Sequence, residues 1–311
     1  MIAWKAPNFD FMRWRHVGLW LSTAINLLAV GSLAFQGLNF SIEFTGGTVV
    51  ELAYEKPADL EEIRHALAGS DFGGGVVQNF GSPREVLLRL PPQHAVDAAD
   101  ASNKDVGARV AKLLPQAEVR RVECVGPQVG EELAEDGVIA SLVALGGILI
   151  YVMLRFTLKF SVGAIVATLH DVLVIVGFFS ITRMEFDLNA LAAVLAVMGY
   201  SLNDTIVIFD RIRENFRSMR TAEPIKVMNL SLNQTLSRTI NTALVTTLSV
   251  LSLFFLGGEL IPGFATALIL GLVVGTYSSI YVASSMVLAL GATRQELLPV
   301  QKEGSEIDSR P

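Results

Sequence analysis

Long apolar segments dominate the pattern of hydrophobic and polar positions along the chain. A helix needs about 20 apolar residues to cross the hydrocarbon region of a bilayer. The pattern therefore predicts six membrane-spanning helices. The six segments are 17–36, 137–154, 162–182, 188–209, 240–257 and 263–290.

The first apolar segment has features of a secretory signal peptide. Lys5, Arg13 and Arg15 precede it, and Ser32-Leu33-Ala34 resembles a cleavage site. Its apolar stretch of about 20 residues exceeds the 7–15 residues of a signal-peptide core. We therefore expect this segment to be kept as the first membrane-spanning helix.

A hydrophilic segment, 37–136, separates the first two predicted spans, and its pattern predicts a mixed α+β domain. Apolar side chains recur at helical spacing in two stretches and at strand spacing in four. The resulting order, βαββαβ, is typical of a ferredoxin-like sandwich. The expected strands are 48–54, 76–80, 85–90 and 118–125, and the expected helices are 58–68 and 104–114.

The chain thus divides into an N-terminal segment with the first span (1–36), the inserted domain (37–136), five further spans (137–290) and a polar tail (291–311). The positive-inside rule predicts how these parts are oriented. Lys and Arg gather in the segments on the side of the N-terminus, whereas the short loops on the other side contain only Arg183. We expect both termini to be cytoplasmic and the inserted domain to face outward.

Composition narrows the classes of function. Of the 311 residues, 51% are hydrophobic and only 17% are charged, which is typical of a membrane protein rather than a soluble enzyme. The inserted domain is acidic, and no basic stripe indicates a nucleic-acid partner. One cysteine, Cys124, and four scattered histidines exclude an intrachain disulfide and argue against a metal cluster.

Motifs for several chemical activities are missing. The sequence contains no phosphate-binding loop, no dinucleotide-binding fingerprint, and neither the G-x-S-x-G nor the H-E-x-x-H pattern of hydrolases. We therefore expect no cofactor, and any energy that the protein uses must come from elsewhere.

Two acidic residues lie inside predicted spans, where such residues are rare and usually functional. Asp171 follows His170 in the third span, and Asp204 lies in the fourth. Polar neighbours of Asp204 (Ser201, Asn203 and Thr205) add to this intramembrane group. Arg238, just before the fifth apolar segment, enters the membrane from the same side as Asp204 and at nearly its depth.

Asp204 and Arg238 together fit a proton relay. Desolvation favours the protonated form of a carboxyl group, whereas a nearby guanidinium favours the ionised form. Because these influences oppose each other, protonation of Asp204 can respond to access from either side of the membrane. A static ion pair that locks two helices together is the alternative for Asp204 and Arg238, and Asp171 with His170 can simply satisfy a polar contact between helices.

Small residues recur at every fourth position of the sixth span, and Gly271 and Gly275 lie at the centre of this row. Such spacing lets helix backbones approach closely. We expect a packing seam along the whole helix, against either this chain or a partner.

Four stretches resemble the SecF family, the smaller-subunit family of the SecDF protein-export complex. Residues 41–48, SIEFTGGT, are similar to the family pattern G-[IV]-D-F-T-G-G-T, with Ser41 and Glu43 in place of Gly and Asp. Residues 199–215, GYSLNDTIVIFDRIREN, are similar to the fourth-span motif. Residues 170–172 and 236–239 match as well.

The resemblance implies membership of the resistance-nodulation-division superfamily and a proton as the coupling ion. It implies SecD as the partner with the second six-helix half, the SecYEG channel and a translocating preprotein as further partners, and the bacterial cytoplasmic (inner) membrane as the location. Asp204 and Arg238 match positions implicated in proton transport, and the inserted domain would be the smaller periplasmic domain.

Two other classes of function stay open at this point. A stand-alone proton-driven exporter of the same superfamily would be supported by a second six-span half within the chain, which this sequence does not contain. An intramembrane aspartyl protease would use Asp171 and Asp204, but its usual G-x-G-D pattern is absent around Asp204. The sequence also leaves open whether sodium replaces the proton.

Overall fold

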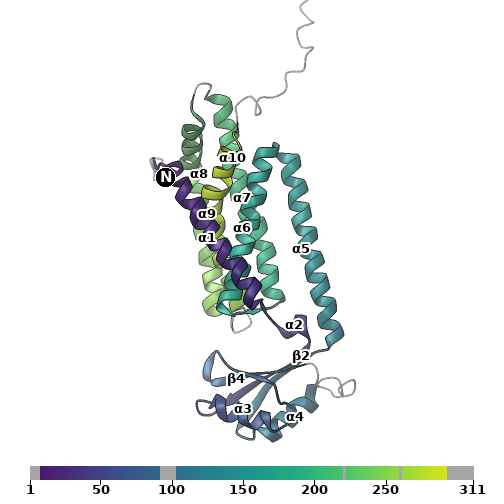
Figure 1. The fold of residues 1–311 in the computed structure, drawn as a ribbon. Coiled ribbons are helices and arrows are strands. Elements are labelled where there is room, and N and C mark those ends of the chain that lie inside the picture. The colour runs from purple at the N-terminus through teal and green to yellow at the C-terminus, as the bar shows by residue number, and fades with distance from the viewer. Residues whose placement is uncertain (1–7, 92–102, 220–221, 259–260, 293–311) are drawn as a thin grey trace, which may run out of the picture.

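The computed structural model describes residues 8–91, 103–219, 222–258 and 261–292. A body of long helices carries a small α/β domain at one end (Figure 1). The predicted tail, 291–311, lies outside the described residues from 293 onward.

In the described part of the chain, six helical segments are long and apolar enough to cross a membrane, as the sequence predicts. They extend beyond the apolar segments, because polar turns continue several of the helices. The first segment, Phe11–Gln36, joins a short 3₁₀ turn (η1, Phe11–Trp14) to α1, and the last joins α9 and α10 through a π-helical turn, η4 (Ser279–Ala283). The helices are α1 (Arg15–Gln36), α5 (Pro127–Arg155), α6 (Leu158–Thr182), α7 (Leu188–Ser218), α8 (Pro224–Leu256), α9 (Pro262–Ser278) and α10 (Ser284–Ala289).

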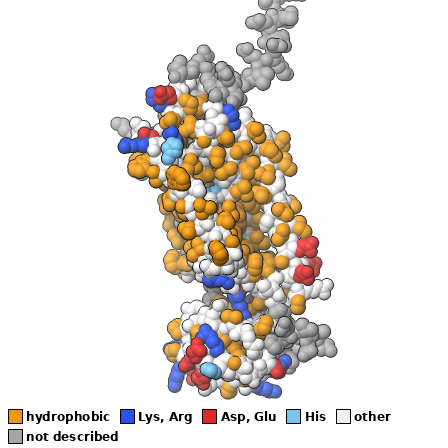
Figure 2. Space-filling view, in the orientation of Figure 1, with side chains coloured by type: hydrophobic (Ala, Val, Ile, Leu, Met, Phe, Trp, Pro, Cys, Tyr) orange, Lys and Arg blue, Asp and Glu red, His pale blue; other side chains and the backbone are white. Residues whose placement is uncertain are grey.

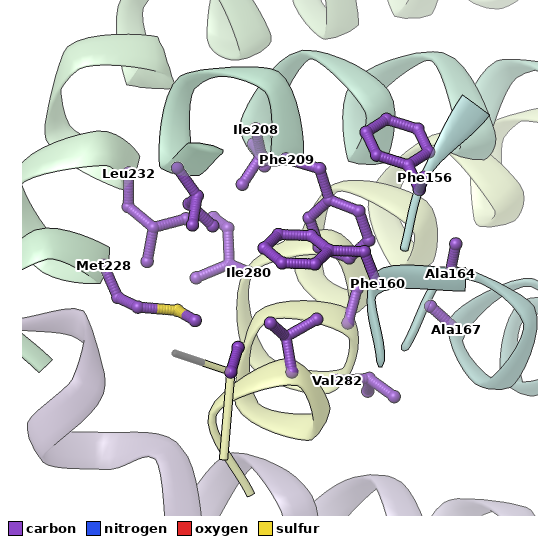
Figure 3. Close-up of a cluster of buried hydrophobic side chains, with 14 of the residues drawn as sticks. Phe156, Phe160, Ala164, Ala167, Ile208, Phe209, Met228, Leu232, Ile280 and Val282 are labelled. Atoms are coloured by element: carbon purple, nitrogen blue, oxygen red, sulfur yellow. The ribbon is translucent and has the colours of Figure 1, made fainter. Parts of the chain in front are cut away.

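The helical body has a buried apolar core near the end that lies away from the α/β domain. Phe160 of α6 and Phe209 of α7 are fully buried, and their rings meet edge to face with centroids 5.0 Å apart. Side chains from α6, α7, α8 and the turn η4 surround them (Figure 3). This cluster therefore joins helices that are far apart in the sequence.

The row of small residues on α9 lies against α7. A Cβ atom added to Gly271 would overlap the methyl groups of Val197 and fall 2.9 Å from its Cβ, and one added to Gly275 would fall 3.0 Å from Cβ of Ser201. The seam therefore meets a helix of this chain, and it brings the α9 backbone close to the part of α7 that carries Asp204.

The surface of the helical body is mostly apolar, while charged side chains gather at its two ends and on the α/β domain (Figure 2). Helix α5 stands apart from the other helices along much of its length (Figure 1). Its side chains Val143 and Leu154 are 69% and 84% exposed. A surface of this kind suits a hydrocarbon environment or an apolar partner.

The α/β domain has the element order β2, α3, β3, β4, α4, β5, which is the order predicted from the sequence. Its sheet has the strand order β3-β4-β2-β5 with antiparallel neighbours. Helix residues such as Ile63 and Val110 share one apolar cluster with Val50 and Leu88 of the strands, so both helices cover the same face. The elements are β2 (Gly47–Tyr54), α3 (Leu60–Ala68), β3 (Val76–Phe80), β4 (Ser82–Leu90), α4 (Asn103–Leu113) and β5 (Ala117–Val125).

Three short elements that the pattern does not predict lie between this domain and the helical body. Strand β1 (Asn39–Phe40) pairs in parallel with β6 (Glu185–Phe186), and a single helical turn, α2 (Ile42–Thr45), follows β1. Phe40, Phe44 and Phe186 pack their rings together at this point. The chain that enters the α/β domain is thereby attached to the loop between α6 and α7.

Candidate functional site

Asp171 lies in the middle of α6, fully buried and surrounded by hydrogen-bonding groups. Ser201 Oγ of α7 donates to Asp171 Oδ2 at 2.5 Å, and Ser278 Oγ of α9 donates to the same oxygen at 2.9 Å. His170 Nδ1 lies 2.9 Å from the other oxygen, Oδ1. Three helices therefore meet at one carboxyl group, whose two oxygens both have polar partners.

Further polar contacts extend this group. Thr205 of α7 and Ser279 of η4 share a hydrogen bond of 2.8 Å between their hydroxyl oxygens. The ring of Tyr277 lies 6.3 Å from that of His170, and its hydroxyl donates to the Gly18 carbonyl of α1 at 2.7 Å. Polar side chains thus continue from α1 to α7 across the body.

The intramembrane polar group predicted from the sequence does not include Ser278, Ser279 or Tyr277. Their signal is the polar run 276–279 inside an otherwise apolar span, which interrupts the pattern in the same way as Asp171 does. A π-helical turn follows at η4, and such turns are frequent at functional sites because they break the regular helical hydrogen bonding.

Asp204 has different surroundings from Asp171. It lies one turn after Ser201 on α7 and is 3% exposed, and its Oδ2 atom has no hydrogen-bond partner among the described residues. Buried polar atoms nearly always have a partner, so an exception needs an explanation. A carboxylate oxygen with an unused acceptor position can take up a proton or an ion.

Arg238 lies on α8 at the same depth as Asp204. Asp204 is 14 residues from the end of α7 at Ser218, and Arg238 is 14 residues from the start of α8 at Pro224. At 1.5 Å per residue, each lies about 21 Å along its helix from the connection between them. Helices α7 and α8 pack together, so the Arg238 guanidinium lies on a helix that neighbours the one with the Asp204 carboxylate.

The two groups do not form a closed ion pair in the described structure. The salt bridges between described residues do not include Arg238, whose side chain is exposed at the surface of the isolated chain. Asn203, beside Asp204, is exposed as well. The static-lock interpretation of Asp204 and Arg238 therefore lacks the contact on which it depends.

Asp171 and Asp204 do not share a hydrogen bond in the described residues, because the Asp171 oxygens bond to Ser201, Ser278 and His170. An aspartyl protease needs two carboxyl groups that share one proton. The geometry therefore gives no support to the protease interpretation, and no group of three or more potential metal ligands occurs among the described residues.

Comparison with known proteins identifies the family. Residues 105–293 match the family described as "Protein export membrane protein SecD/SecF, C-terminal", and residues 31–58 match the "SecD/SecF GG Motif". The chain is 50% identical to the protein translocase subunit SecF of Vibrio alginolyticus, over 98% of this chain and 97% of that one. The chain belongs to the SecF family of protein translocase subunits.

Other relatives and solved structures agree. The SecF of Pseudomonas aeruginosa is 45% identical over 99% of each chain. The crystal structure of SecDF from Thermus thermophilus superposes with a TM-score of 0.83 at 40% identity over 92% of this chain. A structure of SecDF in a "super-membrane-facing form" gives a TM-score of 0.67. This chain covers 39% of each SecDF chain, so it corresponds to one part of those longer polypeptides.

Proposed function

We propose that this protein works with SecD to promote the translocation of preproteins through the SecYEG channel after the ATP-driven step, using the proton motive force. Full-length identity of 40–50% to SecF proteins supports this assignment. We place the protein in the bacterial cytoplasmic membrane, with both termini cytoplasmic and the α/β domain on the outer side. The bias of Lys and Arg among the short loops supports this orientation.

In this proposal Asp204 carries the proton and Arg238 is its fixed counter-charge. The observation that carries it is a buried carboxylate oxygen without a partner among the described residues, at the depth of a guanidinium that does not close on it. Arg suits this role because it does not deprotonate. Each proton that crosses a potential of 100 mV supplies about 2.3 kcal/mol.

Asp171, His170, Ser201 and Thr205 form the support for Asp204 in this scheme. Ser201 donates to Asp171 and lies one turn before Asp204 on the same helix, so the two carboxyl groups belong to one polar region of the body. When Asp204 is neutralised, its attraction to Arg238 weakens, and α7 and α8 shift relative to each other. No cofactor takes part, since the proton is the coupling ion.

We propose that helices of SecD cover two polar residues that are exposed on the isolated chain. Asn203 and Arg238 are exposed although they lie well within spanning helices, and lipid is a poor environment for both. A second set of helices packed on this face would cover them. The extra length of the SecDF chains is consistent with such a second half.

We propose a ferredoxin-like fold for the outer domain, on the basis of its element order and its strand order β3-β4-β2-β5. The domain would hold or release the translocating polypeptide as the helices shift. Its excess of acidic over basic residues favours contact with positively charged or polar segments.

Replacement of Asp204 by Asn tests the proposal. We expect Asp204→Asn to abolish the stimulation of preprotein export by a proton gradient in membrane vesicles that contain SecD and SecYEG, because Asn cannot take up a proton. Glu214→Gln is the matched control, since it removes an exposed carboxylate from the same helix. ATP-driven export without a gradient should be the same in both variants.

Two outcomes would contradict the proposal. If Asp204→Asn vesicles keep their dependence on the proton gradient, Asp204 is not the carrier. If a sodium gradient alone stimulates the unaltered protein and a proton gradient does not, the coupling ion is sodium.

A further inference from the structure

The start of α7 is held by a side chain from a distant part of the sequence. Asp187 caps this helix locally, because Ala190 N donates to its Oδ1 at 2.6 Å. In addition, Leu188 N donates to Glu43 Oε2 of α2 at 2.7 Å. A carboxylate at a helix N-terminus satisfies an otherwise unpaired N–H and interacts favourably with the helix dipole. Glu43 is therefore a second cap, supplied 145 residues earlier in the chain.

Backbone pairing holds Glu43 in place. Strand β1 pairs with β6, and Ser41 N donates to the Phe186 carbonyl at 3.1 Å just beyond the pair. Ser41 Oγ then accepts from Glu43 N at 3.2 Å and so starts the turn of α2. Glu43 thus reaches α7 from a segment that is itself fixed to the loop before that helix.

One further contact attaches the outer domain to the loop before α7, and close packing at two glycines shapes the entry to the domain. Gly46 and Gly47, both at positive φ, lead from α2 into β2. A Cβ on Gly46 would lie 2.9 Å from Pro127 Cα, and a Cβ on Gly47 would lie 2.7 Å from the Leu90 carbonyl oxygen. From the next strand of the sheet, Arg89 of β4 forms an ion pair with Glu185 of β6. The Arg89 side chain is 13% exposed and that of Glu185 is 34% exposed, so the guanidinium is mostly shielded from water and the carboxylate is partly shielded.

We propose that Glu43 and the Arg89–Glu185 ion pair make the outer domain and α7 move as one body. The three side chains are then positioning residues, which couple movement of α7 to movement of the outer domain. We call these three residues the α7 linkage. Asp204 lies 16 residues after Leu188 on the same helix, about 24 Å along its axis. The inference rests on the proposed function, in which Asp204 causes α7 to shift and the outer domain acts on the polypeptide. The α7 linkage would transmit that shift from the helix to the domain.

Charge exchange tests the ion pair in the full complex with SecD. Arg89→Glu and Glu185→Arg each place like charges together, and we expect each to lose the gradient-stimulated part of export while ATP-driven export continues. The double variant Arg89→Glu with Glu185→Arg restores opposite charges and is expected to recover stimulation. If the single variants retain full stimulation, the ion pair does not transmit motion. The same conclusion follows if the double variant restores the amount of protein in the membrane but not the stimulation of export.

The cap has a separate test that does not depend on correct charge pairing. In Glu43→Ala, hydrogen exchange of the Leu188 amide should be about fivefold faster, the factor that loss of an N-cap predicts. Glu43→Gln keeps an acceptor oxygen and should keep more of both exchange protection and gradient-stimulated export than Glu43→Ala does. Faster exchange with unchanged stimulation in Glu43→Ala would show that the cap is structural only.

Cross-linking asks directly whether the two parts separate during the cycle. Cys124 is the single cysteine, so Cys124→Ser provides a background for Arg89→Cys with Glu185→Cys. Because the two cysteines remove the ion pair, we expect the uncross-linked variant to lose gradient-stimulated export, and joining the thiols with a short bismaleimide should restore it. Full stimulation before cross-linking, or no recovery after it, would overturn the proposal. Asp204→Asn in the same vesicles separates the two hypotheses. If Asp204→Asn loses stimulation while the variants of the α7 linkage keep it, the linkage proposal is wrong. If Asp204→Asn keeps stimulation, the proposed function is wrong.

Discussion

At the scale of single residues, the two intramembrane carboxyl groups differ in their hydrogen bonding. Asp171 accepts from Ser201 and Ser278, whereas Asp204 Oδ2 has no partner among the described residues. A carboxylate with fixed donors is held in place, and one without them is free to exchange a proton. Sequence identifies both as intramembrane acids, but the donors decide which role each can take.

Ser201→Ala is expected to lower the free energy of unfolding by about 1–3 kcal/mol, because it removes a hydrogen bond to a buried carboxyl group. Thermal unfolding in detergent measures this change. Ser252→Ala is the control, since its exposed hydroxyl donates to the Leu248 carbonyl one turn earlier and to no other group in the described part of the chain. Equal melting temperatures for the two variants would mean that the Ser201 contact contributes nothing.

At the scale of elements, the packing of α9 on α7 depends on the absence of a side chain at Gly271. The facing residue, Val197, is fully buried and β-branched, so it has little freedom to move aside. The same close approach joins α1 and α6, where a Cβ on Gly177 would overlap Ala29 and fall 2.8 Å from its Cα. Small residues therefore set the distances between helices that carry the polar group.

Gly271→Ala is expected to destabilise the protein by about 1–3 kcal/mol, the usual cost of overpacking. Gly199→Ala, on α7, has no atom within 4 Å of the added Cβ, and it should be neutral or stabilise the helix by up to about 1 kcal/mol. Thermal unfolding of both variants gives the comparison. A Gly271→Ala variant as stable as Gly199→Ala would mean that the seam opens without cost.

At the scale of the whole molecule, a helical body and an α/β domain meet at the α7 linkage. Burial raises the pKa of Glu185 above its ordinary value of 4.5; Arg89 opposes this effect, and Asp187 and Glu43 add to it. The folded state therefore binds the Glu185 proton more tightly than the unfolded state does. By linkage, the stability that this group contributes is present below pH 4.5 and is lost as the pH rises through the raised pKa.

Glu185→Gln should flatten this part of the pH dependence, because Gln does not titrate but still accepts a hydrogen bond from Arg89. Melting temperatures of both proteins between about pH 4 and 8 provide the measurement. The difference between them should change in favour of the variant as the pH rises. A constant difference over this range would contradict the raised pKa of Glu185.

The sequence by itself predicted the six candidate spanning helices that the described residues contain and the element order of the α/β domain. Both depend on the length and period of apolar stretches, which are local properties: the predicted strand 76–80, for example, is β3 (Val76–Phe80). The bounds of the helices were less accurate, because amphipathic turns continue α7 and α8 beyond their apolar segments.

Only the tertiary structure decided which of the polar residues meet. Sequence identified Asp171 and Ser201 as polar residues in neighbouring spans, but their hydrogen bond depends on how α6 and α7 are rotated toward each other, which only the packed helices define. Glu43 stands out in sequence only as a departure from a motif, and its partner, the Leu188 amide, is 145 residues away. Contacts of this kind depend on where helix ends and strands come together in space, and no periodicity along the chain encodes that.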